Sequence, residues 1–195
     1  MSASDLEAVL DELGKAMRAV DPGELRALQE RVGAARRVFV AGAGRSGLVV
    51  RAFAMRLMHL GLQVYVVGDV TTPAFAAGDL LMIGSGSGET DSLCAVARKA
   101  KALGGVLAVV TIVPSSTLAQ LAEVVVRVDA PSPKAAAQAG AQRRRSVQPM
   151  GALFEQTMLL LLDAVVMRLA AARGASPDEL FARHANLERD GNLLM

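Results

Sequence analysis

The sequence predicts an α/β fold, a three-layer sandwich in which a five-stranded parallel sheet is flanked by helices. Short runs of apolar residues recur through the middle of the chain, and stretches with helical periodicity separate most of them. Runs that are apolar throughout, without alternation, are typical of parallel strands covered on both faces. Loops rich in glycine follow two of these runs, at the strand ends where an open parallel sheet binds its ligand.

The size and composition of the chain fit one globular domain. Its 195 residues are 52% hydrophobic, which is enough to bury a core. We expect a single domain over residues 1–195, with N-terminal helices in 3–35, the sheet core in 37–129 and C-terminal helices in 151–188. A net charge of +2 and an aromatic content of 3% give little reason to expect a nucleic-acid partner.

We expect a cytoplasmic protein without a membrane segment. The N-terminus lacks the charged and then apolar pattern of a signal sequence. The apolar stretch over residues 158–166 is short and contains Asp163, so it does not fit a membrane span. Cys94 is the only cysteine and can form no internal disulfide, which fits a reducing compartment and a small core residue.

Two helices are predicted before the sheet, because apolar residues recur there at helical spacing. Ser4 and Asp5 are suitable N-caps for the first helix. Asp21 precedes the second helix, and Pro22 fits its first position. These helices could cover the sheet or pair with another copy of the chain, and the sequence leaves both possibilities open.

From residue 37 onward the pattern becomes that of strands alternating with helices. Predicted helices cover 48–60 and 91–102. The predicted strands cover 38–41, 63–67, 80–83, 106–111 and 124–128.

The chain is organised around the loop that follows the third predicted strand. Residues 84–90 read Gly-Ser-Gly-Ser-Gly-Glu-Thr and lead directly into the helix predicted over 91–102. Glycines let the backbone approach a ligand, Ser85, Ser87 and Thr90 can donate hydrogen bonds, and the helix N-terminus offers free N–H groups. This combination predicts a seat for an anion, most often phosphate. A plain capped turn is the alternative, which three hydroxyls on one short loop make weaker.

The first glycine loop allows two functions. Residues 42–47 match the dinucleotide-binding pattern G-x-G-x-x-G, and Asp69 lies where a ribose-binding acid is expected. This would predict a nicotinamide or flavin enzyme. The second, hydroxyl-rich loop and the short chain argue against it. Arg45 and Ser46 suit a single sugar phosphate better than a pyrophosphate turn.

Residues 130–149 differ in composition from their surroundings. Prolines, an Ala/Gln-rich run and three consecutive arginines at Arg143, Arg144 and Arg145 predict a surface connection. Charge runs usually face water, so a solvated loop is favoured over an anion-binding one. The loop could also fold over the mouth of the site.

One acidic residue in the C-terminal third is a candidate general base. Glu155 lies near the start of a predicted helix over 152–173 that is apolar nearly all round. A carboxylate in such a place needs a partner or a chemical purpose, and proton abstraction is one such purpose. Asp163, further along the same helix, is better explained as a structural hydrogen-bond partner.

The two histidines differ in their expected roles. His59 lies at the end of its helix far from the ligand loop and is interpreted as a packing residue. His184 belongs to a final helix that Ser176 and Pro177 begin and that carries residues 183–188. A lone histidine near a terminus would ordinarily lie on the surface.

Several motifs together resemble the 6-phospho-3-hexuloisomerases, enzymes of the sugar isomerase (SIS) domain family. The motifs are residues 40–47, 54–61, 84–90, 148–151, 153–156 and 183–188. The resemblance covers nearly the whole chain and implies the SIS fold and a homotetramer. It also implies interconversion of D-arabino-hex-3-ulose 6-phosphate and D-fructose 6-phosphate, in the ribulose monophosphate pathway of formaldehyde fixation. Residues 130–145 depart from the motifs, so no site residue is taken from them.

The chemistry that the resemblance implies needs a general base but no metal or redox cofactor. Moving a carbonyl from C3 to C2 requires proton removal from C2, a cis-enediol and protonation at C3. Glu155 is the expected base, and His184, supplied by a neighbouring subunit as in related sugar isomerases, moves protons among the oxygens. Arg45 is expected to stabilise the enediolate or to bind phosphate. The remaining expected substrate-binding residues are Gly44, Ser46, Ser85, Ser87 and Thr90.

Two other classes of function remain open at this point. A SIS domain that senses a sugar phosphate without catalysis would keep the serine loop but would not need Glu155 or His184. A Rossmann-type oxidoreductase would bind a nicotinamide cofactor at residues 42–47.

Overall fold

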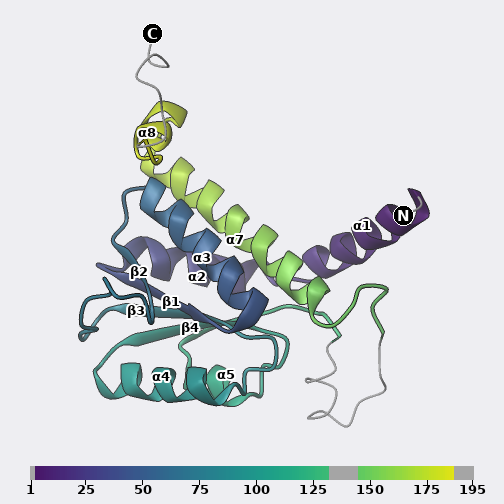
Figure 1. Cartoon of the computed structure of the whole chain (residues 1–195), viewed down its shortest axis with the longest axis horizontal. Coiled ribbons are helices and arrows are strands. Elements are labelled where there is room, and N and C mark those ends of the chain that lie inside the picture. The colour runs from purple at the N-terminus through teal and green to yellow at the C-terminus, as the bar shows by residue number, and fades with distance from the viewer. Residues whose placement is uncertain (1–2, 132–144, 187–195) are drawn as a thin grey trace.

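The computed structural model describes residues 3–131 and 145–186 and contains a five-stranded, all-parallel sheet (Figure 1). The strand order is β2-β1-β3-β4-β5. The strands are β1 (Val38–Gly42), β2 (Val64–Val66), β3 (Leu80–Gly84), β4 (Val106–Thr111) and β5 (Val124–Arg127). The predicted α/β sandwich is confirmed, and each strand lies within two residues of its predicted bounds.

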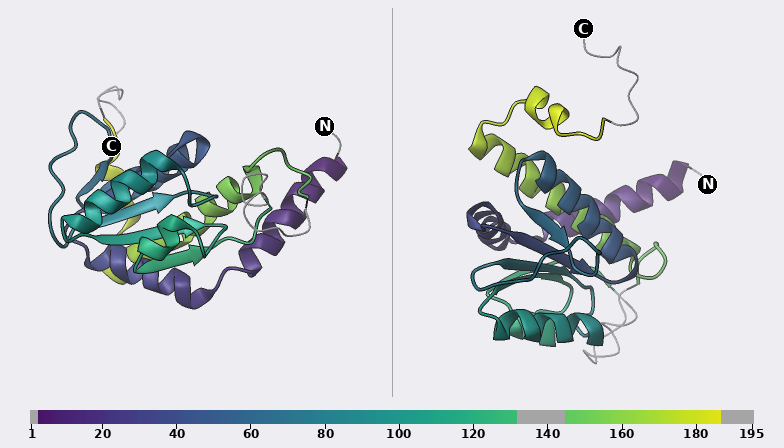
Figure 2. Two further views of the ribbon diagram at one scale, coloured as in Figure 1. Left: turned by 90° about the horizontal axis from the view of Figure 1, so that it is seen from below. Right: turned by 60° about the vertical axis from the view of Figure 1, so that its left-hand side comes forward.

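Helices cover both faces of the sheet, which makes three layers (Figures 1 and 2). One face carries α2 (Pro22–Ala34), α3 (Gly44–His59) and the long α7 (Ala152–Arg173), with α1 (Ala3–Arg18) packed against α7. The other face carries α4 (Asp91–Ala102) and α5 (Thr117–Leu121). The short α8 (Pro177–Ala182) follows the C-terminal end of α7.

The two covered faces explain why the strands are apolar throughout. In β1, Val38 and Val40 belong to the core on the α3 and α7 side, whereas Phe39 and Ala41 belong to the core on the α4 side. Successive side chains of a strand point to opposite faces, so both sets must be apolar when both faces are buried.

The start of α3 differs from its prediction. The helix begins at Gly44 and not at residue 48, so Arg45 and Ser46 belong to its first turn. Gly44 has φ +56°, a left-handed conformation that turns the chain from strand to helix without a longer loop. A Cβ on Gly47 would lie 2.6 Å from the carbonyl oxygen of Gly42, so only glycine permits this close approach.

Other helix ends also depart from the predictions. Ser4 and Asp5 lie inside α1 and are not its caps, although an acidic residue in a first turn still interacts well with the helix dipole. The five-residue α5 was not predicted, because so few residues carry no periodic pattern. The last helix ends at Ala182. Residues 183–186 were predicted to be helical, and the structure places them after the helix. Residues 187–188 lie outside the described residues.

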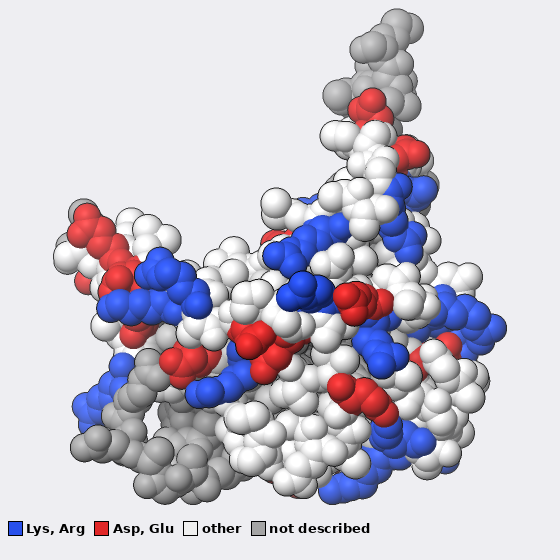
Figure 3. Space-filling model, turned by 180° about the vertical axis from the view of Figure 1, so that it is seen from behind, with Lys and Arg blue, Asp and Glu red and all other residues white. Residues whose placement is uncertain are grey.

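Two further predictions concern the whole chain, namely that it has no membrane segment and that it forms a single domain. None of the described helices has the length and apolar composition needed to cross a membrane. On the face in Figure 3, acidic and basic side chains are interspersed, as on an ordinary solvated surface. The single domain over residues 1–195 stays a prediction, since residues 132–144 and 187–195 lie outside the described parts.

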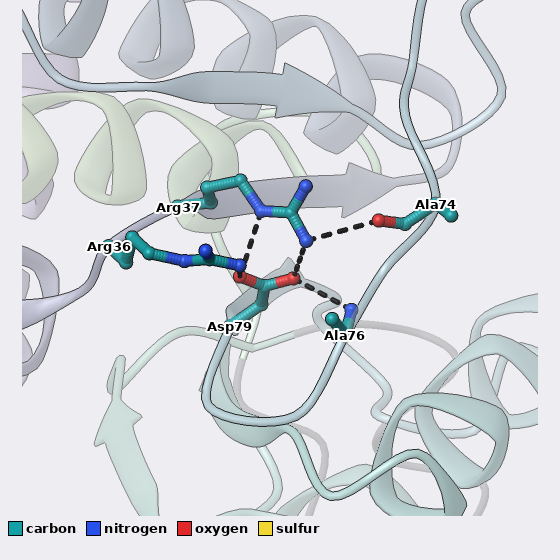
Figure 4. A network of polar contacts seen from close by, with 5 residues as sticks. All are labelled: Arg36, Arg37, Ala74, Ala76 and Asp79. Carbon is teal, nitrogen blue, oxygen red and sulfur yellow. Dashed lines mark hydrogen bonds and ion pairs between the residues drawn. The ribbon is translucent and has the colours of Figure 1, made fainter.

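A buried ion pair holds the N-terminal edge of the sheet together (Figure 4). Asp79, just before β3, is fully buried, and Arg37, just before β1, donates to its carboxylate from Nε at 3.0 Å and from Nη2. The backbone N–H of Ala76 donates to the same carboxylate at 2.7 Å. Burial acts to raise the pKa of Asp79, but these hydrogen bonds and the charges of Arg37 and Arg36 outweigh it and lower the pKa.

We predict that Asp79→Asn lowers the free energy of unfolding by about 3 kcal/mol, because the partly buried charge of Arg37 then loses its fully buried partner. Chemical denaturation at pH 7 measures this loss. The folded-state pKa of Asp79 lies below its unfolded value, so the carboxylate stabilises the protein above about pH 4. The difference between the two proteins should therefore shrink as the pH falls below 4.

The matched control is Asp11→Asn. Asp11 pairs with Lys15 on the exposed face of α1, and such surface pairs contribute less than about 1 kcal/mol. Equal losses in the two variants would contradict a special role for Asp79.

Candidate active site

A cavity of about 290 Å³ lies at the carboxyl ends of β1 and β3. These strands are neighbours in the sheet, but the chain leaves β1 toward one edge and β3 toward the other. Such a topological switch point opens a crevice between the two strand ends, which is where open α/β sheets bind ligands. The walls come from the loops after β1 and β3, from Ile112 after β4, and from the start of α7.

Three helix N-termini meet at this cavity. The N-cap residues are Ala43 for α3, Thr90 for α4 and Gly151 for α7, and all three line it. Within the described chain, none of the three caps its helix through a side-chain hydrogen bond. The first N–H groups of these helices are therefore left to a ligand, and their dipoles favour an anion.

The helices that begin elsewhere are different. Three of them start with a side-chain oxygen that accepts a hydrogen bond from the backbone of the first turn. These caps are Asp21 of α2, Ser116 of α5 and Ser176 of α8. Side-chain caps are thus present away from the cavity and missing around it, among the helices whose N-caps are described.

The serine loop has a defined conformation. The N–H of Gly88 donates to Ser85 Oγ at 3.2 Å, and the N–H of Glu89 donates to Ser87 Oγ at 3.3 Å. Gly88 has φ +66°, and a Cβ there would lie 2.0 Å from Ser116 Oγ, so this position requires glycine. Ser85 is buried, whereas Ser87 and Thr90 are partly exposed to the cavity.

Contacts to neighbouring elements hold the same loop in place. Glu89 accepts a hydrogen bond from the N–H of Thr117 at 2.7 Å, at the start of α5. The hydroxyl of Thr111, at the end of β4, donates to the carbonyl of Gly86 at 3.2 Å. The loop is therefore held in shape before any ligand binds, which reduces the entropy cost of binding.

Thr90 provides a direct test of the anion seat. We predict that Thr90→Val raises the dissociation constant for inorganic phosphate about tenfold, because a hydrogen bond to a charged group contributes about 1.5 to 3 kcal/mol. Thr71→Val is the matched control, since Thr71 is exposed in a loop and is not among the lining residues. Titration with phosphate measures both constants, and equal affinities would contradict the assignment.

The predicted general base lies in this cavity. Glu155, in the first turn of α7, has 16% of its side chain exposed, and its Oε2 lies 3.0 Å from Nε of Arg45. Arg45, on the opposite wall of the cavity, is thus the partner that this carboxylate needs in an apolar helix. The other predicted residues that line the cavity are Gly44, Ser46, Ser85, Ser87 and Thr90.

The cavity also has an apolar wall, which the sequence did not predict. Leu93, Ile112, Met150 and Phe154 line it together with the polar residues. Ile112 could have been found, because it follows a strand at the carboxyl edge of the sheet. Met150 has φ +55°, which no pattern in the sequence indicated.

The other predicted carboxylates lie outside the cavity lining. Asp163 is exposed, so its predicted role as a buried hydrogen-bond partner is wrong; this position of α7 faces away from the core. Asp69 pairs with Arg51 at 2.8 Å on the surface, where both side chains are 40–50% exposed. In the described part of the chain, no three His, Cys, Asp or Glu side chains are grouped so that they could hold a metal ion.

His184 lies far from the cavity of its own chain. It follows α8, beyond the C-terminal end of α7, and the 22 residues of α7 span about 33 Å (Figures 1 and 2). Its exposed ring stacks on that of His59, with centroids 5.4 Å apart. Arg183 Nη1 donates to the carbonyl of His59 at 3.2 Å, so this turn rests on the end of α3.

His59 is a packing residue, as predicted. It is 5% exposed at the end of α3. Burial lowers the pKa of His59, and the charges of Arg56 and His184 lower it further.

Comparison with known proteins identifies the family. Residues 33–160 match the model of the SIS domain. The chain belongs to the SIS domain family. A relative in Bacillus subtilis named 3-hexulose-6-phosphate isomerase is 43% identical over 180 residues, which cover 92% of this chain and 95% of the relative. A relative of the same name in Mycobacterium gastri is 44% identical over 185 residues, covering 95% and 90%.

A solved structure is also similar to this chain. It is a hypothetical protein of Methanococcus jannaschii, described as inferring a molecular function of 3-hexulose-6-phosphate isomerase. It has a TM-score of 0.79 and 32% sequence identity, and the match covers 94% of this chain and 99% of that one. This SIS domain chain is an isomerase, and the alternatives of a non-catalytic sensor and an oxidoreductase are disfavoured.

Proposed function

We propose that this protein interconverts D-arabino-hex-3-ulose 6-phosphate and D-fructose 6-phosphate through a cis-enediol, as a step of the ribulose monophosphate pathway. One observation carries the proposal. The Glu155 carboxylate and two hydroxyl-bearing loops line one cavity, into which three helices point N-termini without side-chain caps. This places an anion seat and a base within reach of one small molecule.

In the proposed complex the phosphate occupies the seat between the start of α3 and the serine loop. Its hydrogen-bond donors are the hydroxyls of Ser46, Ser85, Ser87 and Thr90 and the backbone N–H groups at the starts of α3 and α4. A phosphate held by several donors fixes the sugar carbons in relation to the opposite wall, where Glu155 lies. Fixing the reacting atoms in this way accounts for a large part of catalysis in such a site.

In the proposed mechanism Glu155 removes the C2 proton and returns a proton to C3. The carbonyl oxygen becomes an enediolate oxygen, which the guanidinium of Arg45 stabilises with its remaining N–H groups. Leu93, Ile112, Met150 and Phe154 limit the access of water on one side, which strengthens these charge interactions. Glu155 thus transfers the proton between the two carbons, and His184 moves the proton between the two substrate oxygens.

We further propose a homotetramer, located in the cytoplasm, in which His184 enters the cavity of a neighbouring subunit. His184 is exposed and lies at the far end of α7 from the cavity in its own chain. Helix α1 projects from the body of the protein (Figure 1), and Leu6 and Leu10 on it are 53% and 67% exposed. Exposed leucines on a projecting helix favour association with another copy.

The proposed function is tested by proton exchange in heavy water. Purified protein is incubated with fructose 6-phosphate and no added cofactor, and deuterium incorporation at the sugar carbons is followed by NMR. The proposal predicts deuterium at C3 of fructose 6-phosphate and at C2 of the 3-hexulose 6-phosphate that forms from it. Binding of fructose 6-phosphate without exchange would contradict it and favour a sensor.

A further inference from the structure

A carboxylate on the first helix is bonded to the chain segment that leads into the active site. Glu12 of α1 accepts hydrogen bonds from the hydroxyl of Ser146 at 2.6 Å, the N–H of Val147 at 3.0 Å and the side-chain amide of Gln148 at 3.3 Å. Burial acts to raise the pKa of Glu12, but these hydrogen bonds and the charge of Lys15 outweigh it and lower the pKa. The carboxylate is therefore ionised when it holds this segment.

The segment that Glu12 holds is itself ordered around these contacts. Ser146 Oγ, which donates to Glu12, also accepts a hydrogen bond from the N–H of Gln148 at 3.0 Å. The side chain of Gln148 is buried, with 7% exposure. Three consecutive residues thus depend on one carboxylate that lies more than 130 positions earlier in the sequence.

The next residues form a wall of the cavity. Met150 and Gly151 line it, and α7 begins directly after them with Glu155 in its first turn. Met150 has φ +55°, a conformation that costs a residue with a side chain about 1 to 3 kcal/mol. Such a conformation persists only where the surroundings hold it, and the bonds to Glu12 lie immediately before it.

The apolar face of α1 already attaches this helix to the protein. Ala16 is buried in the core, and Leu13 and Met17 pack against that core. The hydrogen bonds of Glu12 are therefore not needed to dock the helix. Their specific effect falls on the segment 146–148 and on the residues directly after it.

We propose that Glu12 is a positioning residue, which holds segment 146–151 so that the first turn of α7 presents Glu155 to the substrate. The inference rests on the proposed function of the same cavity. Glu12 touches no reacting atom; it acts through the backbone between Gln148 and Glu155. Of the three helix N-termini at the cavity, the proposed phosphate seat uses those of α3 and α4, whereas Glu12 acts on the start of α7. We therefore expect Glu12 to affect the chemical step and not phosphate binding.

The test compares Glu12→Ala with Glu7→Ala, a matched change on the exposed part of the same helix. Alanine favours helices at least as well as glutamate, so neither change disrupts α1. We expect Glu12→Ala to lower kcat about tenfold, with KM and the inhibition constant of inorganic phosphate within about twofold of wild type. Glu7→Ala should leave all three constants unchanged.

Two further variants test the same role if Glu12→Ala does not fold. Ser146→Ala removes one hydrogen-bond partner of Glu12 without changing α1. We expect its kcat to fall while its KM stays close to that of wild type. Glu12→Gln keeps an oxygen for the N–H of Val147, so its kcat should lie between those of wild type and Glu12→Ala.

The outcomes separate this inference from the proposed function. Wild-type protein without isomerase activity would overturn the proposed function. Active wild type with unchanged kcat in both Glu12→Ala and Ser146→Ala would overturn the positioning role alone. An equal loss of kcat and of phosphate affinity would also overturn it, because that pattern reports general damage to the site.

Discussion

Glu155→Gln is expected to lower kcat about 1000-fold, with little change in KM. The amide keeps the shape of the side chain and its contact with Arg45 but cannot accept the C2 proton. General acid–base catalysis contributes about 100- to 10,000-fold in enzymes, so the loss of the only carboxylate that lines the described cavity falls in that range. Steady-state kinetics and deuterium exchange with fructose 6-phosphate both measure the effect.

Asp163→Asn is the control for this change. It makes the same replacement of a carboxylate by an amide on the same helix, at an exposed position away from the cavity. Its kcat should match that of wild type. Near-normal turnover of Glu155→Gln would remove Glu155 from the mechanism, even if the phosphate seat proved correct.

His184→Ala is expected to lower kcat about 100-fold, because proton transfer among the substrate oxygens then lacks its histidine. A second measurement shows where the histidine acts. Coexpression of Glu155→Gln and His184→Ala chains should restore about one quarter of wild-type activity, since random assembly gives about that share of sites an intact Glu155 and a neighbour's intact His184.

The control for complementation is coexpression of Glu155→Gln with a chain that carries both changes, which can form no intact site. Activity that stays at the level of the single variants in the first mixture would place His184 outside the neighbour's site. Its stacking on His59 in the same chain would then be its principal contact.

The strands and most helices could be predicted because their signals are local. Residues 106–111 and 91–102 have the same bounds in sequence and structure, since continuous apolar runs and helical spacing each arise within one element. The start of α3 could not be placed, because Gly44 turns the chain by a left-handed φ while Gly47 packs against a strand. Both glycines also fit a longer loop.

Much of the candidate site could be predicted for a general reason. Parallel strands bring their carboxyl ends to one edge, so Arg45 and Ser46 after β1 were expected at the same edge as Ser85 and Ser87 after β3. The structure makes β1 and β3 neighbours, which brings the two loops together. Glu155 was indicated by its chemistry, as a carboxylate in an apolar helix. The ion pair that Glu155 makes with Arg45 needed the structure, because the two residues are far apart in the chain.

The sequence by itself determined the sheet, its ligand edge and the identity of the anion-binding loops, since strand periodicity and loop composition are properties of short segments. Only the tertiary structure decided which helix N-termini meet without caps, that Met150 lines the cavity, and that Glu12 holds the segment before it. It also decided that His184 lies at the opposite end of α7 from Glu155. These features depend on how distant segments pack, and packing is set by the whole core rather than by any one stretch of residues.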